Sequence, residues 1–167
     1  NRFECDSRVS ERALREIYLR GFEICVKEAD PWTIMSSYNL INGCHTSVSY
    51  ELLTEMLRNE WGFKGMVTTD WGVHSSHSDE VLAGNDVKMG DGEPEELKAA
   101  FENGKITRAD LETSVRRILE LTMKSRNKSD IKQSSRPRGC FCMFGLYYAR
   151  FIRGFLAKID IAKSILQ

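Results

Sequence analysis

The stretch WTIMSSYNLINGCHTSVSYELLTEMLRNEWGFKGMVTTDWG, residues 32–72, decides the fold of this chain. It contains two short apolar runs with a helix-period segment between them. The first run, 33–37, ends at Tyr38, and the second, 65–69, ends at Asp70. A strand, a helix and a second strand predict a parallel β–α–β unit. Because the chemistry of parallel α/β folds gathers at the carboxyl ends of strands, the two run ends predict a site.

Helix-period patterns flank this unit on both sides. The first begins at Ser10, a good N-cap residue, and its apolar face includes Cys25, which we expect to be a core thiol. The last has Leu119 on the side that we expect to be buried. A loop is expected over 38–48, with a turn at Asn42-Gly43. The remaining pattern predicts helices at 10–29, 49–60, 78–83, 94–103 and from Thr107, and a strand at 85–89.

Several pieces of the chain, taken in order, resemble glycoside hydrolase family 3 in its large β-glucosidase-type branch. Each piece is weak alone, but the pieces keep the family's order and approximate spacing over residues 1 to 124. The matching pieces are SERALREIYLRGFE (10–23), MSSYNLING (35–43), LLTEMLRNEWGFKG (52–65), TTDWG (68–72), AGNDVKMG (83–90) and VRRIL (115–119).

The resemblance implies a retaining glycosidase that acts on a small-molecule glycoside or oligosaccharide. Asp70 falls on the family's catalytic nucleophile. Met35 and Tyr38 fall on the Met-x-x-Tyr positions that line the sugar subsite, and Trp71 falls on the aromatic residue after the nucleophile. The smaller branch of the family usually has a second Asp at the position of Trp71, so the resemblance favours the multi-domain β-glucosidase type.

The chemistry explains these residue types. A retaining glycosidase needs an ionised carboxylate and, about 5 Å away, a protonated group with a raised pKa. Tyr38 would donate a hydrogen bond near Asp70 and favour its ionised form, while the indole of Trp71 suits the C–H face of a pyranose. This chemistry requires no metal or other cofactor. The spacing His74-x-x-His77-x-Asp79 suits a metal site, but its Ser-rich loop setting favours an ordinary loop.

The fold class predicted is α/β, a partial (β/α)₈ TIM-type barrel. A whole barrel needs about 250 residues, so this chain is too short for one, and the resemblance implies that residues 1–125 are its C-terminal half. We expect the other barrel half, with its Lys-His pair, and a second domain that supplies the acid/base to lie outside this chain.

The tail, residues 126–167, differs in charge from the rest. Residues 1–125 carry 15 basic and 22 acidic residues, a net charge of −7, whereas the tail carries 9 basic and 2 acidic residues, a net charge of +7. We interpret the tail as a reading-frame or assembly artefact. The alternative is a genuine basic amphipathic helix over 146–159. No 18-residue stretch of the tail is free of charge, so no membrane span is predicted, and no module for nucleic acid is recognisable.

Two functions remain open from the sequence. The first is a fragment of a retaining β-glycosidase, a β-glucosidase above all, that hydrolyses terminal non-reducing β-D-glycosidic bonds through a covalent glycosyl-Asp intermediate. On its own such a fragment lacks the acid/base and should be inactive. The alternative is a non-catalytic degenerate product that acts as a sugar-binding or interaction protein.

Overall fold

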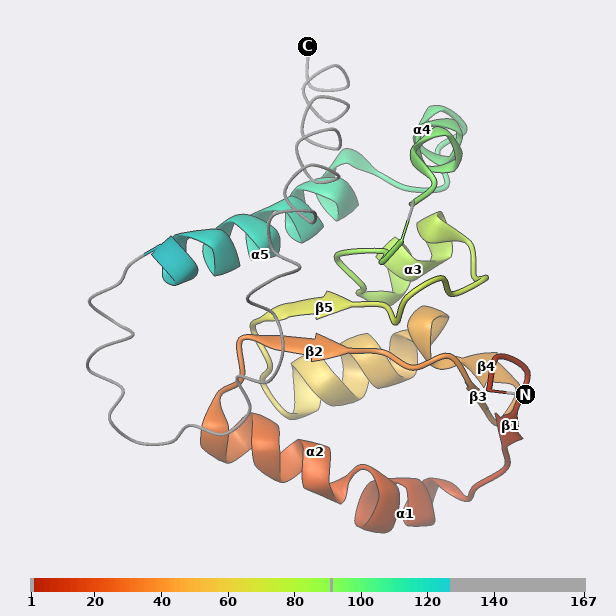
Figure 1. Ribbon diagram of the computed structural model, residues 1–167, viewed down its shortest axis with the longest axis vertical. Coiled ribbons are helices and arrows are strands. Elements are labelled where there is room, and N and C mark those ends of the chain that lie inside the picture. The colour runs from red at the N-terminus through yellow and green to blue at the C-terminus, as the bar shows by residue number, and fades with distance from the viewer. Residues whose placement is uncertain (1, 91, 127–167) are drawn as a thin grey trace.

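A computed structural model describes residues 2–90 and 92–126 (Figure 1). The tail interpreted above therefore lies outside the described residues. The strands are β1 (Asp6–Ser7), β2 (Thr33–Met35), β3 (Leu40–Ile41), β4 (Cys44–His45) and β5 (Met66–Thr68). The helices are α1 (Glu11–Ala13), η1 (Leu14–Tyr18), α2 (Arg20–Ile24), η2 (Cys25–Ala29), η3 (Thr46–Val48), η4 (Glu51–Glu60), α3 (His77–Ala83), α4 (Pro94–Glu102) and α5 (Arg108–Arg126).

The predicted β–α–β unit is confirmed. Strands β2 and β5 pair in parallel, with Thr33 opposite Met66 and Met35 opposite Thr68, and η4 connects them. The expected strand at 85–89 is reduced to a parallel bridge between Thr68 and Val87. The described residues therefore show three neighbouring extended segments in the order β2, β5 and the segment around Val87.

The segment expected to be a loop, 38–48, instead contains two short strands. Strands β3 and β4 form an antiparallel hairpin, and β1 adds to it in parallel. The predicted turn at its tip is confirmed: Asn42 and Gly43 have φ angles of 52° and 87°, as a tight hairpin turn requires. The side chain of Asn42 also bonds the backbone of Val9 in both directions, so the hairpin fixes the N-terminal segment beside it.

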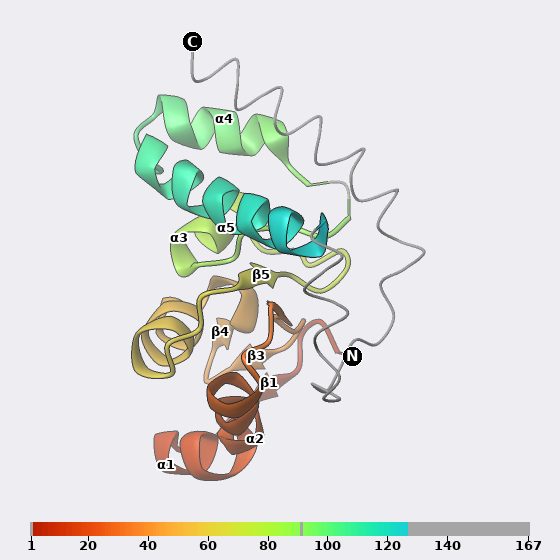
Figure 2. The same ribbon diagram turned by 90° about the vertical axis from the view of Figure 1, so that its left-hand side faces the viewer.

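Strand β5 lies between two helical layers (Figure 2). Helices α4 and α5 are on one side of it, and α1, α2 and η4 are on the other. One core cluster joins η2, η4, α3 and one face of β5: Val26, Leu53, Leu57, Phe63, Val67 and Ala83. A second joins the other face to α5: Met66, Val87, Met89 and Ile118. Burial on both faces explains why β5 reads as a continuous apolar run.

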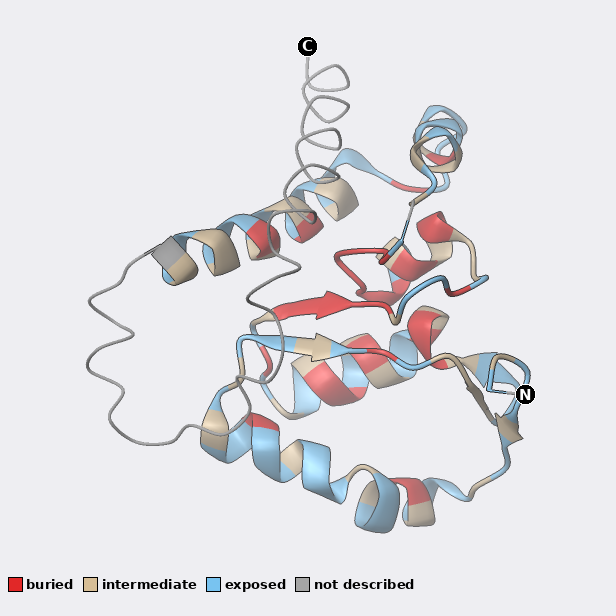
Figure 3. Ribbon diagram, viewed as in Figure 1, coloured by how far each residue is buried: buried red, intermediate tan, exposed pale blue. Residues whose placement is uncertain are grey.

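The helix that begins at Ser10 is less buried than its pattern suggests (Figure 3). α-Helical and π-helical segments alternate along it from Glu11 to Ala29, and Ser10 caps it through a bond from Ala13 N. Only Leu14 and Val26 of this helix are buried. The expectation that Cys25 is a core thiol is wrong, because its side of the helix faces solvent in the described structure.

The final helix gives a similar correction. Ile118 is buried against β5, but Leu119 is 44% exposed, so the expected burial of Leu119 is wrong. The face of the helix that packs on β5 contains Ile118, and Leu119 lies outside that face. None of the helices in residues 2–90 and 92–126 is long and apolar enough to cross a bilayer.

Candidate active site

Asp70 follows β5, and Tyr38 follows β2 after two further residues. Because these strands are parallel neighbours, both residues leave the sheet at the same edge. The hydroxyl of Tyr38 donates to the carbonyl oxygen of Trp71. The backbone N–H of Trp71 donates to Oδ1 of Asp70 at 2.6 Å. The structure thus brings Tyr38, Asp70 and Trp71 into contact.

The ionisation of Tyr38 reflects this contact. Loss of hydration raises the pKa of the Tyr38 phenol, and the adjacent Asp70 carboxylate raises it further. The phenol therefore stays protonated at neutral pH and remains a hydrogen-bond donor.

Met35 and Trp71 offer apolar surface at the same edge. Met35 is the last residue of β2 and is 55% exposed, so it is not core filler. Trp71 is 56% exposed, and a large exposed indole beside a carboxylate is the arrangement expected of a sugar platform. The structure places Met35 at the end of the strand that leads to Tyr38.

Three further side chains join this site, and the sequence pattern did not single out two of them. Phe3 packs on Tyr38 with ring centroids 4.6 Å apart, and it stacks on His74 at 5.2 Å with an angle of 5° between the rings. The guanidinium of Arg2 lies 4.8 Å from the centroid of Tyr38. Arg2 and Phe3 precede Tyr38 by more than thirty residues, and the pairing of β1 with β3 carries them there.

A buried ionic cluster lies beside β5, towards the amino end of the strand. Asp86 accepts a bond from Val67 N at 2.8 Å, and it pairs with Arg58 at 3.0 Å and with Arg117 at 2.9 Å. Its side chain is fully buried. Burial raises the pKa of Asp86, while the two guanidinium groups oppose that change. Burial also lowers the pKa of Arg58 to about 10, so Arg58 remains charged at neutral pH.

The two histidines weighed as metal ligands have different surroundings. His74 is exposed and stacks on Phe3, whereas His77 is buried and its Nδ1 accepts a bond from Glu93 N at 3.4 Å. Asp79 instead forms an ion pair with Lys105. Within the described part of the chain, no group of three or more His, Cys, Asp or Glu side chains is arranged to hold a metal ion.

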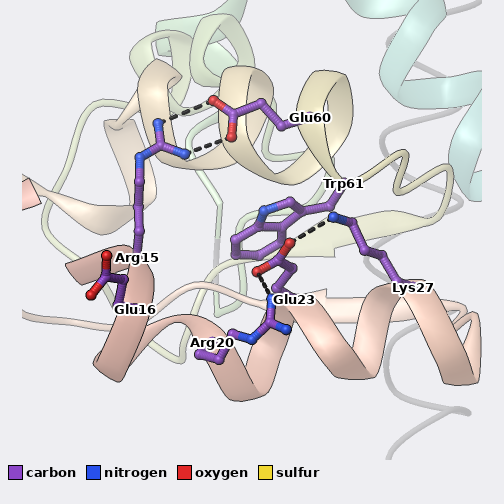
Figure 4. A pocket seen from close by; sticks show the side chains of 7 residues that line it. All are labelled: Arg15, Glu16, Arg20, Glu23, Lys27, Glu60 and Trp61. Carbon is purple, nitrogen blue, oxygen red and sulfur yellow. Dashed lines mark hydrogen bonds and ion pairs between the residues drawn. The ribbon is translucent and has the colours of Figure 1, made fainter. Parts of the chain in front are cut away.

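A cavity of about 350 Å³ lies between the first helix and the end of η4 (Figure 4). The cations and carboxylates that line it are mostly paired with each other. Arg15 forms a two-bond pair with Glu60, and Glu23 pairs with both Arg20 and Lys27. Trp61 packs against the core beneath them. The cavity belongs to the outer helices rather than to the strand ends, so we treat it as separate from the site at Asp70.

Comparison with known proteins agrees with the resemblance drawn from the sequence. Residues 4–121 match the glycosyl hydrolase family 3 N terminal domain. Beta-glucosidase A of Butyrivibrio fibrisolvens is 53% identical over 112 residues, which cover 67% of this chain and 14% of that protein. An exo-alpha-(1->6)-L-arabinopyranosidase of Bifidobacterium breve is 42% identical over 127 residues, covering 75% of this chain and 17% of that protein.

Solved structures give the same result. The chain superposes on beta-glucosidase 3B from Thermotoga neapolitana, solved in complex with glucose, with a TM-score of 0.70 and 44% identity. That match covers 72% of this chain and 18% of the other. The described fold is thus that of part of a glycoside hydrolase domain. The chain belongs to glycosyl hydrolase family 3, and it spans between 14% and 18% of the length of these relatives.

Proposed function

We propose that this chain supplies the nucleophile-bearing part of a retaining β-glycosidase, and that the parent activity is that of a β-glucosidase. The observation that carries the proposal is the contact of Tyr38, Asp70 and Trp71 at the ends of two parallel strands. The site includes Met35 and Arg2 as further sugar contacts. Residues 1–125 form the C-terminal half of the barrel domain, and the other half and the acid/base lie elsewhere in the complete protein.

The reaction follows from these groups. The Asp70 carboxylate attacks the anomeric carbon of a terminal non-reducing β-D-glycoside, and the bond from that carbon to the leaving oxygen breaks. The acid/base gives its proton to the leaving oxygen. It then takes a proton from the water that hydrolyses the glycosyl-Asp70 ester, so the product keeps the β configuration. The N–H of Trp71 holds the Asp70 carboxylate in place for the attack, and Tyr38 fixes Trp71 through its bond to the Trp71 carbonyl.

The sharpest test uses a chimaera in which residues 4–121 replace the matching segment of the Butyrivibrio fibrisolvens enzyme. We expect it to cleave an aryl β-glucoside. In the chimaera, Asp70→Ala should lower kcat about 10⁴-fold or more. Added azide should restore part of the rate and yield the α-glycosyl azide. A 2-deoxy-2-fluoro β-glucoside should label the peptide that contains Asp70, as mass spectrometry would show.

The matched control is Asp79→Ala, which removes a surface carboxylate that pairs with Lys105. It should leave kcat unchanged. Near-normal turnover by Asp70→Ala, or a covalent label on another peptide, would exclude Asp70 as the nucleophile.

The isolated 167-residue chain does not separate the proposal from the non-catalytic alternative, because both predict that it is inactive. Because we place the acid/base elsewhere, the isolated chain should not turn over an aryl β-glucoside. A chimaera that folds but neither hydrolyses nor becomes labelled would favour the sugar-binding or interaction protein instead.

A further inference from the structure

Lys88 is a buried cation directly after the bridge residue Val87. Its side chain is 6% exposed. Its Nζ donates to the backbone carbonyl of Ser75, and it pairs with Glu80 Oε1 at 2.9 Å and with Glu93 Oε2 at 3.5 Å. A single ammonium group therefore joins the loop after Asp70 to the start of α4 and to α3.

Ser75 is held by more than Lys88. Its hydroxyl donates to Glu80 Oε1 at 2.7 Å and lies 2.8 Å from the hydroxyl of Ser47 in η3. The far end of the loop is thus fixed from three directions, by the segment that follows β5 in the sheet, by α3 and by η3.

The near end of the loop is fixed by the same extended segment. Thr69 N donates to Val87 O at 2.9 Å, Met89 N donates to Thr69 Oγ1 at 2.9 Å, and Gly72 N donates to Met89 O at 3.3 Å. Asp70 lies between Thr69 and Gly72. Residues 87–89 therefore hold the loop on both sides of Asp70, and Lys88 supplies the contact farthest from the strand.

A contribution to stability does not by itself explain the ion pair between Lys88 and Glu80. Glu80 is completely buried, and its Oε2 has no hydrogen-bond partner among the described residues. The desolvation of two buried charges commonly offsets their attraction, so an apolar pair of similar volume would stabilise the fold about as well. What an apolar side chain could not replace is the bond from Lys88 to the Ser75 carbonyl.

We propose that Lys88 is a positioning residue for the nucleophile, and that it acts through Ser75 to fix the loop that sets the orientation of Asp70. Lys88 does not touch the sugar. The proposal rests on the proposed function of Asp70, but it can fail separately. Loss of the bond from Lys88 to Ser75 should lower the rate of the nucleophilic step and leave substrate binding nearly unchanged. A displacement of the Asp70 carboxylate near 1 Å is enough to reduce the rate by a large factor.

The test compares variants of the chimaera by their labelling with the 2-deoxy-2-fluoro β-glucoside. The double variant Lys88→Met/Glu80→Gln removes both buried charges at once, which protects the fold. It should keep a melting temperature close to that of the unmodified chimaera, while the first-order labelling rate falls about 10- to 100-fold and the inhibitor's Kd changes less than about twofold. Lys88→Arg keeps the positive charge, so its first-order labelling rate should fall less than that of the double variant. The first-order rate is a property of folded molecules only, so partial misfolding does not obscure it.

Lys105→Met is the matched control, because Lys105 also pairs with a carboxylate of α3, Asp79, but at the surface. The Lys105→Met variant should be labelled at the same rate as the unmodified chimaera. If the double variant labels at that rate too, Lys88 serves only to neutralise Glu80 and the proposal is overturned. If Asp70→Ala stays active, the proposed function fails first; if Asp70→Ala is inactive and rescued by azide, a normal Lys88 variant refutes only this inference.

Discussion

The two sides of the described structure contrast in how they are covered. Strand β5 has core clusters on both faces and the buried Asp86 cluster beside it. The helix from Glu11 to Ala29 meets the rest through Leu14 and Val26, while Ile17, Tyr18 and Phe22 are each more than half exposed. Both regions are rich in apolar residues. They differ in whether other parts of the described chain cover those residues.

This contrast indicates which parts of the structure are held rigidly. The loop that carries Asp70 rises from the covered region, where polar side chains are fixed by several partners each. Preorganised groups of this kind are what the proposed attack by Asp70 needs. The ion pairs of the first helix lie near solvent instead, where such pairs contribute little.

The largest effect should come from breaking the buried cluster. Asp86→Ala in the full 167-residue chain leaves Arg58 buried without its carboxylate, and we expect a loss of about 3–5 kcal/mol of unfolding free energy. Urea denaturation measures it. Asp79→Ala, at an exposed pair, should cost less than about 1 kcal/mol. Equal losses would show that burial of the pair does not matter.

The next largest effect should come from replacing a glycine in each of the two regions with alanine. A Cβ at Gly65, just before β5, would lie 2.3 Å from the carbonyl oxygen of Trp32, so Gly65→Ala should destabilise the chain by about 1–3 kcal/mol. Gly21 in the first helix has nothing within 4 Å of its Cβ position, and Gly21→Ala should stabilise by about 0.5–1 kcal/mol. Thermal unfolding distinguishes them. A neutral Gly65→Ala would contradict the close packing before β5.

The pH dependence of stability should carry a contribution from Glu80. Burial raises the pKa of Glu80 above its ordinary value of 4.5. An acid with a raised folded-state pKa stabilises the fold fully below its unfolded pKa and loses that contribution as pH rises through the folded value. The unfolding free energy of Glu80→Gln, relative to the unmodified chain, should therefore rise with pH from 4.5 upward. Urea denaturation across a pH series measures this difference in unfolding free energy. A difference that stays constant or falls with pH would contradict the prediction.

The smallest effect should appear on the exposed helix face. Phe22→Ser should change the unfolding free energy by about 0.5 kcal/mol or less, because Phe22 is 57% exposed. It should also reduce self-association in sedimentation experiments, since exposed apolar patches favour association. Leu57→Ala, at a buried position of η4, should cost about 2–5 kcal/mol. A comparable loss for Phe22→Ser would mean that this face is covered in solution.

The sequence predicted the parts of this structure that depend on local pattern and strand direction. The β–α–β unit, the turn at Asn42-Gly43 and the meeting of Tyr38 with Asp70 follow from those rules. The family is confirmed by the comparisons. The barrel half and the roles of the site residues stay predictions.

Other features could not be read from the chain. The periodicity of a helix shows which face is apolar but not what packs on it, and so the expected burial of Cys25 and Leu119 was wrong. The cluster of Phe3, Tyr38 and His74 depends on where β1 docks, and a two-residue strand leaves no pattern in the sequence.

The bond between Tyr38 and Trp71 joins residues 33 positions apart, as does the bond between Val9 and Asn42. Contacts of such span form only after the intervening chain has been closed into a loop, whereas helices such as α5 can form from neighbours alone. Tyr38 should consequently reach Asp70 and Trp71 late in folding, after the local bond between those two residues can form. A chain still emerging during synthesis would have its helices before these contacts, and any early intermediate should lack the meeting of Tyr38 with Asp70 and Trp71.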